Sequence, residues 1–220
     1  MITGYARLLF VLAGLASLMG CIETRFESPP GDNVETCDVR WKGLWTGSED
    51  AQAAQRNATA FHVDDNCAFT VLEQATPGGP LKRTRVPVNY VHANGKDYLV
   101  VADTAIKGLV SLRPPHAIDP KPEKSFFFAR YRVHGDRIDM YQVDSARVAK
   151  LVIDGKLDGT VDKSPNELHV FVRGGRAQML DVLRGPSVFD ESSPLKLVRR
   201  GQDLESFERS VRHAAKATPP

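Results

Sequence analysis

The sequence lacks the short motifs that mark the common hydrolases, metal enzymes and nucleotide-binding proteins. It has no Gly-x-Ser-x-Gly, no His-Glu-x-x-His, and neither a P-loop nor a Gly-x-Gly-x-x-Gly fingerprint. Catalytic residues can also converge from distant positions, so these absences leave catalysis itself open. The sequence thus singles out no catalytic residue, metal ligand or cofactor, and we expect none.

A strong charge of either sign is also missing. The net charge is +2, with 25% charged and 42% hydrophobic residues, which is an ordinary globular balance. No block of lysine and arginine exceeds a few residues, so a nucleic-acid surface is not expected.

The longest apolar run is too short to cross a membrane. It covers Leu8–Met19, about twelve residues, whereas a transmembrane helix needs roughly 20. A single basic residue, Arg7, precedes it, as in a secretory signal peptide.

The run ends in Leu18-Met19-Gly20-Cys21, which resembles the lipobox of bacterial lipoproteins, although Met19 is larger than that pattern prefers. The resemblance implies that Cys21 carries a diacylglyceryl (palmitate-type) group, becomes the first mature residue and is acylated on its amine. Many lipoproteins are retained in the inner membrane by an aspartate directly after the acylated cysteine, and this chain has Ile22 there. The resemblance therefore implies an outer-membrane protein that faces the periplasm. The alternative is an ordinary signal peptide with Cys21 an incidental thiol.

Only three cysteines occur, and assigning Cys21 to lipid leaves Cys37 and Cys67 as an even pair. In an oxidising compartment such a pair predicts a disulfide, worth roughly 3–4 kcal/mol in the chain-entropy model. A thiolate metal site or a nucleophile are the alternatives, but there is no Cys-x-x-Cys to support them.

Composition divides the chain into four parts. The sequence predicts a signal peptide over 1–20, a flexible tether over 21–36, a β-rich domain over 37–200, and a C-terminal helix and tail over 201–220. The tether is inferred from the polar, proline-containing stretch at Ser28–Asn33.

Alternating polar and apolar residues predict about nine strands and two or three helices within the domain. Asn94-Gly95 is a strong hairpin signal, and His134-Gly135-Asp136 marks a second hairpin. Hairpin connections imply antiparallel pairing. We therefore expect a mainly β, α+β fold: an antiparallel barrel or a tight sandwich.

Gly43-Leu44-Trp45 on the first expected strand is similar to the opening motif of lipocalins, in which the tryptophan packs across the closed end of a barrel. A late helix at Arg176–Arg184, followed by a strand ending in Arg199-Arg200, is also lipocalin-like. The second lipocalin motif is missing, and a helix at 144–155 interrupts the meander. The resemblance implies architecture alone.

Two groups of residues are candidates for a site. Phe126 and Phe128 alternate with core positions and precede Arg130 and Arg132 on the same face, which predicts an outward contact surface. His62 and Asp64 share one face of a strand, a pattern that fits a cation site but is more typical of a strand followed by a turn.

Three functions are compatible with these observations. The first is a non-enzymatic envelope lipoprotein, held at the membrane by its lipid, that binds a partner protein or an apolar small molecule. The second is an envelope hydrolase using scattered carboxylates and His62. The third is a lipoprotein that senses redox state or stress through the Cys37–Cys67 bond.

Overall fold

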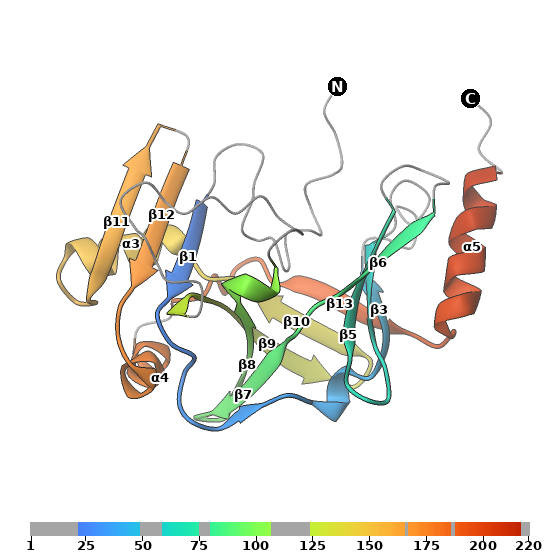
Figure 1. Cartoon of the computed structure of the whole chain (residues 1–220), viewed down its shortest axis with the longest axis horizontal. Helices are drawn as coiled ribbons and strands as arrows, with labels where there is room; N and C mark the ends of the chain where they lie inside the picture. Colours follow the sequence, from blue (N-terminus) through green and yellow to red (C-terminus); the bar gives the residue numbers. More distant parts are fainter. Residues whose placement is uncertain are drawn as a thin grey trace.

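The computed structural model describes residues 22–48, 59–74, 80–106, 124–165, 167–185 and 188–216 (Figure 1). The expected signal peptide and Cys21 lie outside these residues. The strands are β1 (Ile22–Phe26), β2 (Val34–Glu35), β3 (Gly43–Gly47), β4 (Thr59–Val63), β5 (Phe69–Gln74), β6 (Leu81–Arg85), β7 (Asn89–Ala93), β8 (Lys96–Ala102), β9 (Phe126–His134), β10 (Arg137–Tyr141), β11 (Gly159–Ser164), β12 (Glu167–Val172) and β13 (Leu195–Arg200). The helices are α3 (Ser145–Ile153), α4 (Arg176–Arg184) and α5 (Leu204–Lys216), with 3-10 turns η1 (Val39–Trp41) and η2 (Asp103–Ala105).

The thirteen strands of the described residues belong to one curled sheet that forms a half-barrel. One path runs β2-β7-β8-β9-β10-β13-β3-β4-β5-β6, and β1, β12 and β11 branch from the start of β9. Among these thirteen described strands, β1 and β12 pair in parallel and the other pairings are antiparallel. The expected mainly β, α+β fold is therefore confirmed.

The two hairpin turns form where the sequence predicts them. Asn94 and Gly95 have φ of 55° and 69°, as the favoured two-residue hairpin turn requires, and they join β7 to β8. Gly135 has φ of 59° in the turn between β9 and β10. Both turns use residues that tolerate the left-handed region.

Aromatic side chains fill the concave face of the sheet. The ring of Trp41 lies 5.3–6.3 Å from the rings of Trp45, Phe69, Tyr90 and Tyr131. These five side chains are at most 3% exposed. Because they come from η1 and four different strands, their contacts hold the sheet in its curl.

Three residues join β6, at one end of the main path, to β7 near the other. Val86 and Val88 in this link are buried in the concave core, and the Val86 amide donates to the Phe69 carbonyl at 2.9 Å. A link this short keeps β6 and β7 close, so the chain itself helps the sheet to curl.

The convex face is covered at two places. Helices α3 and α4 form a second core with β1, β8, β9 and β12, in which Phe26 stacks on Phe128 at 4.1 Å. Helix α5 places Phe207 and Val211 over Leu44, Ala60 and Leu72. Strands β8 and β9 are thus buried on both faces.

The expected flexible tether at 21–36 is wrong near both of its ends, because Val34–Glu35 form strand β2 and pair with β7. Residues Ile22–Phe26 form strand β1, and Glu23, Thr24, Arg25 and Phe26 are at most 4% exposed. Their charged side chains bury against partners of opposite charge, which composition alone does not reveal. The first expected strand, which carries Gly43-Leu44-Trp45, forms as β3 from Gly43, and the 3-10 turn η1 precedes it.

Candidate functional site

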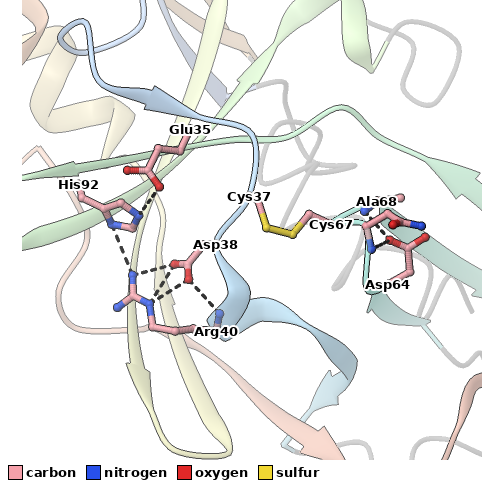
Figure 2. The surroundings of a disulfide bond; sticks show 9 residues. Glu35, Cys37, Asp38, Arg40, Asp64, Cys67, Ala68 and His92 are labelled. Atoms are coloured by element: carbon pink, nitrogen blue, oxygen red, sulfur yellow. Dashed lines mark hydrogen bonds and ion pairs between the residues drawn. A yellow bond between two sulfur atoms is a disulfide. The ribbon is translucent and has the colours of Figure 1, made fainter.

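A group of polar side chains joined by hydrogen bonds and ion pairs lies beside the cysteine pair (Figure 2). Cys37 and Cys67 are placed as a disulfide with their Cα atoms 5.3 Å apart, within the range that a disulfide spans. Cys37 follows β2, which pairs with β7, and Cys67 lies between β4 and β5. The bond therefore joins the two sides of the half-barrel next to the short link between β6 and β7.

Asp38 and Arg40, just after Cys37, form the centre of this group. Nη2 of Arg40 donates to Asp38 Oδ2 at 2.7 Å, and Nη1 donates to Asp97 Oδ2 at 2.9 Å. His92 Nδ1 lies 2.7 Å from the other Asp97 oxygen, and its Nε2 lies 3.8 Å from Glu35. Arg40 thus ties η1 to strands β7 and β8.

Asp38 is 5% exposed yet remains the acceptor of several hydrogen bonds. Burial by itself raises the pKa of this carboxyl, but hydrogen bonds from Arg40 and from the Tyr131 hydroxyl outweigh it and hold the pKa below its usual range. Burial and the bond to Asp38 raise the pKa of Tyr131. The carboxylate is fully engaged, so this cluster fastens the barrel and offers no general base.

A second charged cluster is formed by side chains of β1 and β12. Glu23 Oε1 is 3.0 Å from Nη2 of Arg25 and 2.9 Å from Nδ1 of His169, and all three side chains are at most 9% exposed. Arg25 Nε lies 3.8 Å from Asp103, and its guanidinium carbon is 5.6 Å from the Phe127 ring centroid. Burial raises the pKa of Glu23, and the nearby Arg25 offsets this only in part.

This cluster has the composition of a carboxylate–histidine site, but its groups face one another. Glu167, on the other side of His169, lies 3.6 Å from Nε2. Within the described ranges, no three His, Cys, Asp or Glu residues are arranged to hold a metal ion. The arrangement holds β1 between β12 and the start of β9.

The expected contact surface on β9 needs correction. Phe126, Phe128, Arg130 and Arg132 do alternate with the core positions, but that face packs into the second core. Phe128 is 6% and Arg130 4% exposed, and Arg130 lies 4.2 Å from the Tyr141 ring and binds Glu191. Phe126 is half-buried, and only Arg132 is exposed. The prediction failed because helices α3 and α4 cover a face that the alternation left open.

His62 and Asp64 belong to a strand followed by a turn, the simpler of the two interpretations of this pair. Asp64 accepts hydrogen bonds from the amides of Asn66 and Ala68, at 2.9 and 2.7 Å, and so closes the turn between β4 and β5. His62 is half-buried on β4, opposite Thr70. Neither residue points to a cation site or to hydrolysis.

Sequence reasoning did not single out Asp38, Arg40, Glu23 or Arg25. One sequence signal for β1 is available. Glu23 and Arg25 alternate with Thr24 and Phe26, so a strand would place the two opposite charges on the same face. Asp38 and Arg40 lie beside a cysteine, but nothing in the sequence locates Asp97 and Tyr131 next to them.

Comparison with known proteins returned no matching family model, curated protein or solved structure. In the part of the chain that the structure describes, no helix is long and apolar enough to cross a membrane.

Proposed function

We propose that this chain is a lipoprotein of the bacterial cell envelope, anchored through acylated Cys21 to the outer membrane and facing the periplasm. Its β domain acts without catalysis, by binding a partner protein. The proposed membrane location is supported by Leu18-Met19-Gly20-Cys21 after a short apolar run. Two or more acyl chains make such anchoring stable.

One observation favours a protein partner over an apolar small molecule. The concave face, where a barrel would hold a ligand, is occupied by aromatic side chains that contact one another, centred on Trp41 at 0% exposure. Small barrels whose interiors are filled in this way are packed cores. The engaged carboxylates of Asp38 and Glu23 likewise support binding over hydrolysis.

Fractionation of cells that express the full chain or its Cys21→Ser variant tests the anchor. We expect the full chain in the outer-membrane fraction, released by detergent and not by salt, and the variant outside it. Native mass spectrometry of the detergent-extracted protein tests the second part: the mass should equal the acylated chain alone. A stoichiometric apolar molecule retained in the domain would overturn the preference for a protein partner.

A further inference from the structure

Strand β1 begins at the residue that directly follows the expected lipid-bearing cysteine. Ile22 pairs with Leu168, and the parallel register continues through Phe26 opposite Val172. The strand is inserted beside β12 and reaches the start of β9 at Phe126. The first residues after the anchor therefore belong to the sheet.

Strand β1 is firmly held on both of its faces. On one face, Phe26 stacks on Phe128, and the Thr24 hydroxyl donates to Ser145 on α3 at 2.8 Å. On the other, Glu23 contacts His169 on β12 at 2.9 Å, and Arg25 lies 3.8 Å from Asp103 on η2. Releasing the strand would expose an aromatic ring and separate buried charges, so β1 does not serve as a linker.

This placement removes the freedom that a tether would give. Consecutive Cα atoms are 3.8 Å apart, so the lipid-bearing residue lies within about that distance of the first paired residue. A flexible segment of about 15 residues would instead separate lipid and domain by roughly 20 Å on average. The domain has little room to move away from the bilayer or to rotate over it.

The end of the sheet at Ile22 differs from the opposite end. The turn between β11 and β12 lies beside the start of β1 (Figure 1). Lys163 and Ser164 at the end of β11 are exposed, as is Pro165, which follows them. Ile22 itself is 46% exposed. A lysine and an apolar side chain are compatible with an anionic lipid surface.

Helix α4 lies at the other end, after β12. It is joined to the β7–β8 turn by a hydrogen bond from Arg184 Nε to Asn94 Oδ1 at 3.3 Å. In Figure 1, α4 and β7 lie at the bottom of the view, and the start of β1 and the β11–β12 turn lie toward the top.

We propose that the acylated protein stands directly on the membrane in a fixed orientation, with the start of β1 and the β11–β12 turn against the lipid headgroups. Helix α4 and the β7–β8 turn then face away from the membrane, where a partner can reach them. This inference rests on the proposed anchoring at Cys21.

Energy transfer to the membrane surface tests this orientation. The full, acylated chain is reconstituted into vesicles of phosphatidylethanolamine and phosphatidylglycerol that carry a headgroup acceptor. A donor dye is attached at Ser164→Cys, the last residue of β11 next to the β11–β12 turn, or at the matched exposed site Ala177→Cys, on α4. We expect several-fold stronger transfer from position 164 than from position 177.

A flexible Gly/Ser insertion of about twelve residues between Cys21 and Ile22 provides the internal control. It should lower the transfer at position 164 and remove most of the difference between the two sites. Equal transfer from both sites without the insertion, in protein whose N-terminal peptide is acylated by mass spectrometry, overturns the orientation and leaves the anchor intact. An unacylated Cys21 overturns both.

Discussion

The guanidinium of Arg199 lies over the ring of Trp45, 4.4 Å from its centroid. The same side chain donates to the backbone carbonyls of Arg40, at 2.9 Å, and Lys42, and its Nε lies 3.1 Å from Asp136. Arg199 is on β13, and the carbonyls belong to the segment that leads into the neighbouring strand β3. One side chain thus joins β13 to the segment that precedes β3.

Replacing Arg199 with alanine should lower the free energy of unfolding by about 3 kcal/mol, because a cation–π contact and hydrogen bonds from a charged group are lost together. Arg199→Lys should recover only part of this, since lysine cannot reproduce the planar fork. Urea denaturation measures both. Arg209→Ala on the exposed face of α5 is the control, and an effect of Arg199→Ala no larger than that of the control would contradict this role.

Removing the cysteine pair should destabilise the domain. The two residues are separated by 30 positions, and in the chain-entropy model a closed loop of this size is worth roughly 3–4 kcal/mol. The double variant Cys37→Ala/Cys67→Ala should therefore melt well below the parent, and adding a reductant should lower the melting temperature of the parent alone. An unchanged melting temperature would show that the pair is not a structural disulfide.

Because of Asp38, the free energy of unfolding should depend on pH in the acid range. Its pKa is lowered in the folded protein, so its contribution is present above the ordinary aspartate pKa of about 3.9 and is lost as pH falls through the folded value. Asp38→Asn should cost about 2 kcal/mol near pH 7, from weakened hydrogen bonds to Arg40 and Tyr131. Denaturation curves at several pH values should show this difference shrinking below about pH 4.

The exposed Asp32→Asn variant is the matched control for Asp38, since Asp32 is 95% exposed. It should follow the parent at every pH. A gap between Asp38→Asn and the parent that stays constant down to low pH would mean that the carboxylate charge of Asp38 does not contribute.

Glu23 should act in the opposite direction. Burial raises its folded pKa, so its contribution is fully present below the ordinary glutamate pKa of about 4.3 and is lost as pH rises through the folded value. Glu23→Gln should remove this part of the pH dependence, leaving a smaller fall in stability between acid and neutral pH than in the parent. Glu205→Gln on α5 is the control: the Glu205 side chain is 83% exposed, and this variant should keep the pH dependence of the parent.

The sequence predicts what depends on local patterns. Both hairpin turns, helix α4 and the end of α3 fall where glycines and apolar spacing place them. The sequence does not predict strand β1, because its charged residues are paired with His169 and Asp103, which are distant in sequence. It does not predict the burial of Phe128 either, because alternation identifies two faces of a strand but not whether helices cover both. Nothing local reports such long-range contacts.

Mass spectrometry of the N-terminal peptide of the mature protein, isolated from bacterial membranes, tests the central claim most directly. We predict that the peptide begins at Cys21 and carries both a thioether-linked diacylglyceryl group and an amide-linked acyl chain. An unmodified Cys21, or a mature chain that begins at another residue, would contradict the account.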